Sequence, residues 1–305
     1  MSEESGENSR TEPRAQSRVQ SPLRRRGKAF VARYRRNTLA MAGLVVTGSV
    51  ILIALLAPVL APYDPAAVNV PARLQGPSLA HPMGTDHYGR DLLSRVLFGA
   101  RIALQVAVAT PLVAGAIGIP VGLLAGYSGG RVDDALMRLM DSIFAFPAIL
   151  LGLTLVAVFG QSLTNIVLAL GIVFIPQFAR VTRGSAVSVV EEEHVRVARS
   201  LGASHVRIML VHVLPFCLSA ILVQATVTAA LAIVLESSLS FLGVGVPSPK
   251  PSWGAILRVG KGYVDSGEWW FSVFPGLAIV VAVLGFNLLG DGLRDVLDPR
   301  TDPNR

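Results

Sequence analysis

A five-residue turn, Gly126-Tyr127-Ser128-Gly129-Gly130, is the first pattern in the sequence that could do chemistry. It matches the G-x-S-x-G motif, in which a serine at a strand-to-helix turn acts as a nucleophile. Here the motif follows a long uncharged stretch of helical character rather than a strand, and no histidine is placed to take the proton of Ser128. The pattern therefore favours a turn after a helix over the active site of an intramembrane hydrolase.

Metal and nucleotide sites are the other chemistry to consider. His81, Asp86 and His87 lie close together in the sequence, but no further residue stands at a metal-ligand spacing from them, so they favour a structural loop. The two Gly-Lys pairs lack the rest of G-x-x-x-x-G-K-[ST], the loop that cradles the phosphates of ATP. Cys217, the one cysteine, is expected to be a small buried residue. We expect no catalytic residue, metal ion or cofactor on this chain.

The composition is that of a membrane protein. Of the 305 residues, 52% are hydrophobic and 15% are charged, and long uncharged runs separate the charges. The formal net charge is +7, and residues 1–36 carry +6 of it, with ten Lys and Arg against four Glu. Because this basic cluster stands directly before an apolar run, it favours a cytoplasmic anchor on the lipid bilayer over nucleic-acid binding. We expect residues 1–36 to be a disordered basic cytoplasmic tail.

Uncharged runs of about 20 residues are long enough to cross the membrane as helices. The first run predicts a transmembrane helix over residues 37–62. Five more are predicted from the runs at 102–130, 142–179 (divided by an outer turn at 160–165), 216–235 and 271–289. Six crossings place both termini on one side, and the arginine-rich loops make that side the cytoplasm. We therefore expect an all-α membrane protein with an extracytoplasmic loop at 63–101, a core domain of five transmembrane helices at 102–291 and a cytoplasmic tail at 292–305.

Small and charged residues near these runs predict packing and boundary positions. A stripe of small residues that lets another helix approach closely is formed by Ala114, Gly118, Gly122 and Gly126. Asp141 is predicted to pair with Arg138, one helical turn earlier. Glu236, the one acid at an outer span boundary, either faces a solute pathway or stands at the membrane lip, where it reaches water or caps a re-entrant turn. A secondary transporter would need more charges than this within its spans.

The longest charged segment between apolar runs, at 184–215, predicts a helix, a break and a second helix. Ser188 and Glu191 have the spacing of a capping box at a helix start. One narrow, largely apolar face is expected from His194, Val197, Ala198 and Leu201. Gly202 can take the left-handed conformation that ends a helix, and Ser204 can cap the next one. A short amphipathic helix outside the membrane is a docking element.

The predicted outer loop resembles the segment that follows the first span in dipeptide, oligopeptide and nickel permeases of ABC importers. Their pattern, HPxGTDxxGRDxxSRxxxGxR, is matched at every fixed position from His81 to Arg101. Its glycines permit tight turns, and its second aspartate is predicted to pair with the arginine four residues later. The motif residues singled out here are Gly84, Asp86, Gly89, Arg90, Asp91 and Arg95. Further matches to the same permeases lie at 236–254 and 287–300.

The charged segment resembles the cytoplasmic coupling loop of these permeases, which reads Glu-Ala-Ala, three residues, Gly, nine residues, Ile, any residue, Leu-Pro. The spacing is intact, but Arg196 replaces the Glu, Val197 the first Ala and His212 the Ile. The resemblance implies that this helix sits in a groove of an ATPase subunit. The coupling residues that it implies are Glu193, Arg196, Val197, Ala198, Leu201, Gly202, Ala203, Leu214 and Pro215.

The resemblance is to the second, C-type permease subunit, and it implies the six-helix fold of type I ABC importers in a bacterial or archaeal cytoplasmic membrane. The implied partners are a homologous permease, an extracytoplasmic binding protein and two ATPase subunits or one fused pair, which bind ATP and Mg²⁺. The implied cargo is a di- or oligopeptide, with nickel or another small solute as the alternative. An ion-coupled secondary transporter is the alternative from another class.

Overall fold

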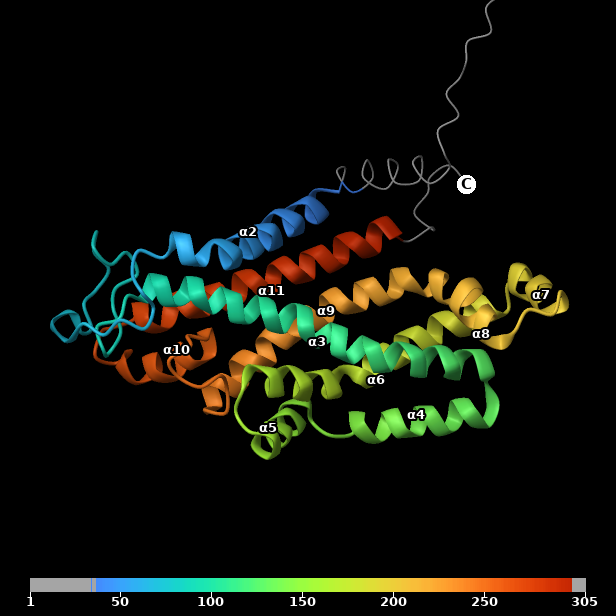
Figure 1. The fold of residues 1–305 in the computed structure, drawn as a ribbon. Coiled ribbons are helices and arrows are strands. Elements are labelled where there is room, and N and C mark those ends of the chain that lie inside the picture. Colours follow the sequence, from blue (N-terminus) through green and yellow to red (C-terminus); the bar gives the residue numbers. More distant parts are fainter. Residues whose placement is uncertain (1–33, 35–36, 298–305) are drawn as a thin grey trace, which may run out of the picture.

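Helices that run the length of the molecule form the fold (Figure 1). The structure, a computed structural model, describes Tyr34 and residues 37–297, and every named element in this part of the chain is helical. Five of these helices are long and apolar enough to cross a membrane, and one bent pair of helices makes a sixth crossing if the two together form one span. The membrane-spanning helices are α2 (Thr38–Leu60), α3 (Leu92–Ser128), the pair α4 (Gly130–Phe144) and α5 (Ala148–Phe159), α6 (Leu163–Val190), α9 (Leu214–Leu242) and α11 (Trp270–Leu297).

Short elements gather at the two ends of this bundle. Helices α7 (Glu193–Ser200) and α8 (His205–Arg207) lie at one end, which we call the coupling end (Figure 1). The segment between α2 and α3 and helix α10 (Trp253–Gly260) lie at the opposite end, which we call the outer end. The remaining elements are the 3-10 helices at Val70–Ala72 and Lys261–Tyr263 and a π-helix at Ile208–Val213.

The start of α2 and the end of α11 meet at the coupling end. Asn37 caps α2 by accepting hydrogen bonds from the backbone N–H groups of Leu39 and Ala40, at 3.0 and 3.1 Å. The Asn37 amide also donates to the Asp295 carboxylate near the end of α11, at 2.8 Å. Both ends of the spanning region are therefore on one side, as an even number of crossings requires. The expected basic tail and residues 298–305 lie outside the described residues, apart from Tyr34.

Two predicted helix boundaries are corrected by the structure. Helix α3 begins at Leu92, ten residues before the predicted start of the second crossing, because Asp91 caps it by accepting from the Ser94 N–H at 2.7 Å. At 37 residues it is about 55 Å long, so its first turns extend beyond the hydrocarbon. Helix α9 likewise continues to Leu242, past the predicted end at 235.

The segment around residue 142, where the sequence predicted that the third span starts, is bent. Helices α4 and α5 meet at an angle of 83°, and α4 occupies the segment predicted to be a turn. Pro147 stands at the break, where its ring and its missing N–H prevent the helix from continuing. Because α4 carries charges on one face, it can lie at an interface, whereas the uncharged α5 enters the apolar layer.

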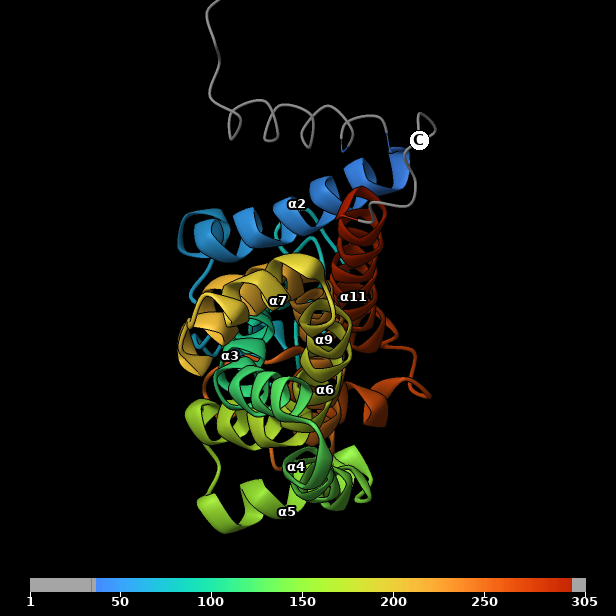
Figure 2. The ribbon, with the colours of Figure 1, turned by 90° about the vertical axis from the view of Figure 1, so that its right-hand side faces the viewer.

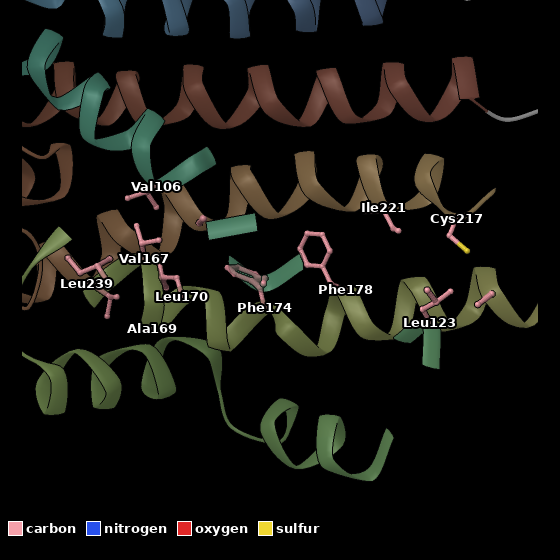
Figure 3. Close-up of a cluster of buried hydrophobic side chains, with 14 of the residues drawn as sticks. Val106, Leu123, Val167, Ala169, Leu170, Phe174, Phe178, Cys217, Ile221 and Leu239 are labelled. Carbon is pink, nitrogen blue, oxygen red and sulfur yellow. The ribbon is translucent and has the colours of Figure 1, made fainter. Parts of the chain in front are cut away.

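The core of the bundle lies where α3, α6 and α9 meet. Side chains of Val106, Phe174, Phe178 and Ile221 from these three helices are among those that fill it (Figure 3). Viewed from the coupling end, α2 and α11 lie on one side of these helices, and α4 and α5 lie on the other (Figure 2). This arrangement leaves α7 and α8 projecting from the central helices.

The stripe of small residues on α3 packs against α6 within this chain. Ala114 is completely buried. A Cβ atom on Gly122 would lie within 2.9 Å of backbone atoms of Ala179, and one on Gly118 would lie 2.6 Å from the Ile175 carbonyl oxygen. At these separations no side chain fits unless the helices move apart. The stripe therefore sets the distance between α3 and α6, the two helices that lead to the coupling end.

We expect Gly122→Val to destabilise the subunit by about 1–3 kcal/mol or more, because the added atoms must displace the α6 backbone. Gly48→Val in α2 is the matched control, since a Cβ there meets no atom within 4 Å. The measurement is the thermal unfolding midpoint of the detergent-solubilised protein. Equal midpoints for the two variants would contradict the close packing of α3 on α6.

Candidate functional site

The coupling end carries a short helix, α7, that begins later than predicted. Helix α6 continues to Val190, and Glu191 ends it, so the predicted capping box is wrong. Ser188 lies inside α6, where its hydroxyl donates to the carbonyl oxygen of Gly184 at 3.4 Å. Helix α7 starts at Glu193, whose carboxylate stands in the first turn, where the positive end of the helix dipole favours it.

Two apolar faces, rather than the predicted single one, characterise α7. Val195 and Ala198 are buried and hold the helix against the bundle. Val197 is 50% exposed and Leu201 is 81% exposed, so these two side chains point away from the subunit. The sequence analysis missed Val195, although it stands three residues before Ala198 on the same helix face. The exposed pair gives the coupling end an apolar contact that the subunit itself leaves uncovered.

A Schellman motif ends α7 and explains three of the predicted coupling residues. Gly202 has φ of +78°, the left-handed conformation that glycine adopts without steric cost. The N–H of Ala203 donates to the carbonyl oxygen of Ala198 at 3.1 Å, the long bond that defines the motif. Ser204 then caps α8 by accepting from the Arg207 N–H at 3.4 Å. The break and the second cap agree with the sequence analysis, and they give the loop a defined shape.

Several contacts tie α7 to the start of α9. The Nε2 atom of His194 donates to the carbonyl oxygen of His212 at 3.1 Å, and Nδ1 lies 3.1 Å from the Glu192 carboxylate. The His194 ring also packs on Phe216, with centroids 4.7 Å apart. The π-helix at Ile208–Val213 leads directly into Leu214 and Pro215, which open α9. Proline has no N–H group to donate to the preceding turn of a helix. The wider π-helical turn before Pro215 accommodates this missing hydrogen bond.

A surface hollow of about 820 Å³ lies on this loop. It is lined by Glu191, Glu192, Glu193, His194, Arg196, Val197, Ala198, Leu201 and His212. Most of the coupling residues named from the sequence are therefore on one continuous surface. Its acidic side chains stand beside the apolar Val197 and Leu201, so a partner would meet both charge and apolar area.

Tyr127 fastens the end of α3 to the coupling loop. Its hydroxyl lies 2.6 Å from Nδ1 of His205 in α8, and the guanidinium of Arg199 lies 5.6 Å from its ring centroid. Sequence reasoning considered Tyr127 only as part of the candidate hydrolase turn. In the structure Ser128 is the last residue of α3, and the nearby His205 is engaged by the tyrosine. The turn therefore positions the loop and lacks the strand-to-helix geometry of a nucleophile elbow.

We expect Tyr127→Phe to loosen the coupling loop by about 1 kcal/mol, because one hydrogen bond that holds the loop is lost. His205→Phe should have a similar effect. The double variant should be no worse than either single variant, since both remove the same contact. The measurement is amide hydrogen exchange in residues 193–207, and additive increases in exchange would show that the Tyr127–His205 contact does not position the loop.

The outer-loop motif forms a buried ion network and a helix cap. Asp86 accepts hydrogen bonds from the backbone N–H groups of Tyr88 and Arg90 at 2.8 and 3.0 Å. Its carboxylate also lies 2.6 Å from the Arg90 guanidinium and 3.5 Å from that of Arg95. The predicted Asp91–Arg95 pair is wrong, because Asp91 caps α3 and binds His81 at 2.9 Å instead.

Glycines and tryptophans complete this outer structure. Gly84 and Gly89 have φ of +76° and +73°, so tight turns form where the sequence analysis expected them. The indole N–H of Trp270 donates to Thr85, and that of Trp253 donates to Val96 at 2.9 Å. Burial lowers the pKa of His87 below its ordinary value, although the charge of Asp86 beside it acts in the opposite direction.

Glu236, predicted to stand at the outer boundary of a span, lies inside α9, which continues to Leu242. It is 2% exposed, and its carboxylate accepts from the Ser240 hydroxyl at 2.7 Å and from that of Ser237 at 3.5 Å. Within this subunit the carboxylate is therefore held by neighbouring serines and does not reach water at the membrane lip. Asp141 also differs from expectation, since it pairs with Arg180 of α6 at 2.6 Å rather than with Arg138. Glu236 therefore bonds to a serine one turn later in its own helix, whereas Asp141 pairs with an arginine of a neighbouring helix.

Polar side chains also occur in the spans where the sequence analysis named none. The Gln224 amide donates to the Gln177 side chain and to the Thr228 hydroxyl, both at 3.1 Å. Glutamines in long apolar runs are the signal that would have found them, because a polar group in the hydrocarbon needs a partner on a neighbouring helix. This pair links α6 to α9, two of the helices from which the coupling loop extends.

Comparison with known proteins places this geometry in a family. Residues 118–303 match the family described as binding-protein-dependent transport system inner membrane component. Residues 26–77 match the N-terminal transmembrane domain of oligopeptide transport permease C. The chain is similar to a chain of the MetNI methionine ABC transporter in an inward-facing conformation, with a TM-score of 0.56 and 18% identity, over 67% of this chain and 96% of that one. That likeness supports the fold.

Relatives of known name give the closer comparison. A dipeptide transport system permease protein of Alkalihalophilus pseudofirmus is 43% identical over 266 residues, which are 87% of each chain. A di/tripeptide transport system permease protein of Pseudomonas aeruginosa is 40% identical, over 92% of this chain and 93% of the relative. A glutathione transport system permease protein of Pectobacterium atrosepticum is 42% identical, over 90% and 91%. The chain therefore belongs to the binding-protein-dependent transport system inner membrane components, as a multi-pass, C-type ABC importer permease of the peptide-transporter group.

Proposed function

We propose that this chain is one of two transmembrane subunits of an ATP-driven importer that carries di- or oligopeptides across a bacterial or archaeal cytoplasmic membrane. A homologous permease would complete the pathway, and an extracytoplasmic binding protein would deliver the peptide. Two ATPase subunits, or one fused pair, would bind ATP and Mg²⁺ and hydrolyse the nucleotide. This chain would perform no catalysis itself. The peptide cargo follows from the names of the relatives, and it is favoured over nickel or another small solute.

The observation that carries the proposal is the exposed surface of α7. This cytosolic helix exposes Val197 and Leu201 to solvent, and a Schellman turn and Tyr127 hold it in place. An exposed apolar surface on a fixed helix is typical of a contact with another protein. Because α7 stands between α6 and α9, a displacement of α7 is passed to two central spanning helices. Closure of the ATPase pair on ATP would move α7 and shift the permease from inward-facing to outward-facing.

The test is peptide uptake into proteoliposomes that contain both permeases and the ATPases, with binding protein outside and ATP inside. We expect uptake that requires ATP and the binding protein and that vanadate inhibits. Uptake driven by an ion gradient without ATP would favour a secondary transporter and overturn the proposal. Uptake of nickel in place of peptide under the same conditions would overturn the cargo alone.

A further inference from the structure

A polar cavity of about 370 Å³ opens at the outer end, away from the coupling loop. Three parts of the chain form it: the outer-loop motif, the turn between α5 and α6, and the segment from the end of α9 through α10. Its ionisable and amide side chains are His87, Arg90, Arg95, Gln161, Lys250 and Arg258. Neither the coupling mechanism nor the spanning helices require such a cavity.

The cavity carries an excess of positive charge. Four cationic side chains line it, and Asp86, the carboxylate that faces two of them, is already bound to Arg90 and Arg95. Lys250 and Arg258 are exposed, and neither forms an ion pair within the described residues. Two cations therefore stand at the cavity without a counter-charge.

Neighbouring polar groups do not cancel this charge. Glu236 hydrogen-bonds to Ser240, which lines the cavity, but its own carboxylate is buried behind that serine. The guanidinium of Arg258 lies against Gly243, only 2.9 Å from where a Cβ atom would be, so its position depends on that glycine. The amide of Gln161 donates to the carbonyl oxygen of Gly243 at 3.3 Å and closes one wall.

Two buried nitrogens at the cavity have no hydrogen-bond partner. Arg95 is 7% exposed, and its Nε lies 3.5 Å from the Asp86 carboxylate but makes no hydrogen bond. The Nδ1 atom of His87 is also buried without a partner. Because neither nitrogen has accessible surface, a ligand would not reach them in this conformation. The exposed Lys250 and Arg258 are the cations that a ligand would meet, and they describe a site for a carboxylate.

We propose that this cavity receives an aspartate or glutamate side chain of the extracytoplasmic binding protein when that protein docks. The inference rests on the proposed function, since it needs a binding-protein-dependent importer. The cavity is built from outer segments of one subunit, so its ligand comes from a partner that stays outside the membrane. A terminal carboxylate of the cargo shares this chemistry, but cargo must pass between two subunits rather than lodge within one.

The test is the dissociation constant of the binding protein for the complete transporter in nanodiscs, measured at low and at raised salt. Lys250→Gln and Arg258→Gln should each raise Kd about tenfold and flatten its salt dependence, because each removes a charge that a carboxylate would meet. Lys261→Gln is the matched control, since Lys261 is an exposed cation three residues from Arg258 and lies outside the cavity. Both altered residues are exposed, so the variants should fold.

Two results would overturn the inference. Kd values within about twofold of the Lys261→Gln control, with an unchanged salt slope, would show that no carboxylate docks in the cavity. An unchanged Kd together with a raised KM for peptides with a free carboxyl terminus, but not for their amides, would assign the cavity to cargo instead. The Kd measurement does not depend on transport. Failure of ATP-driven peptide uptake would therefore contradict the proposed function but would not decide whether a carboxylate docks in the cavity.

Discussion

Leu201→Glu is expected to lower ATP-driven uptake about tenfold or more, while the permease remains folded and inserted. Leu201 is the most exposed large apolar side chain of the coupling loop, at 81%. Few residues of an interface carry most of its binding energy, and those cost at least about 2 kcal/mol when lost. A carboxylate at this position must also be desolvated when an ATPase subunit covers it, which adds to the loss.

The measurement is uptake per transporter in proteoliposomes, together with retention of the ATPases during purification. Leu79→Glu is the matched control, because Leu79 is fully exposed at the outer end and the chemical change is the same. The control should retain the ATPases during purification as the unaltered protein does. Normal uptake by Leu201→Glu at wild-type abundance would show that α7 does not dock through this face. Ala198→Arg would be a poorer test, because Ala198 is buried and its replacement would disturb the fold itself.

Asp86→Asn is expected to destabilise the outer loop by about 3–5 kcal/mol, enough to reduce the amount of folded permease severely. Asp86 is completely buried, and its carboxylate faces the buried guanidinium groups of Arg90 and Arg95. Removing the negative charge leaves both guanidinium groups, whose side chains are only 10% and 8% exposed, without a compensating carboxylate. The same carboxylate also accepts the backbone N–H groups of Tyr88 and Arg90, so the turn itself would loosen.

The measurement is the yield and unfolding temperature of the detergent-solubilised subunit. Asp265→Asn, which alters an exposed acid at the same end, should leave both unchanged. Adding Arg95→Met to Asp86→Asn should recover part of the loss, because one uncompensated buried cation is then removed. A variant as stable as the Asp265→Asn control would show that the Asp86 network does not hold the loop.

Some of the fold could be predicted because the signals are local. Length and lack of charge identify a membrane-crossing helix without knowledge of its neighbours, so α2 was found close to its observed bounds. Helices α6 and α11 were also found, but each continues past its predicted end, at 179 and 289 respectively. The left-handed Gly202 and the cap at Ser204 are likewise local, since both depend on the preferences of one residue and the next few.

Several of the wrong predictions concern the choice of one partner over another. Asp91 has an arginine one turn later, but it caps α3 and binds His81, because Asp86 already occupies that arginine. Asp141 pairs with Arg180, which is distant in sequence, rather than with Arg138. Ser188 has the spacing of a cap, but α6 runs through it because its packing against α3 continues to that point. The spacing of residues in the sequence shows which pairs can form. It does not show which partner a side chain takes when several are within reach.

The sequence by itself determined the class of protein, the number of crossings and the position of the coupling loop, because hydropathy, charge and glycine placement act over a few residues. Only the tertiary structure decided that α4 and α5 break at 83°, that Val195 points inward while Leu201 points outward, and that Glu236 is buried. It alone brought the outer-loop motif, Gln161 and Arg258 around one cavity. These outcomes depend on which helices lie side by side, and that arrangement is set by packing across the whole chain.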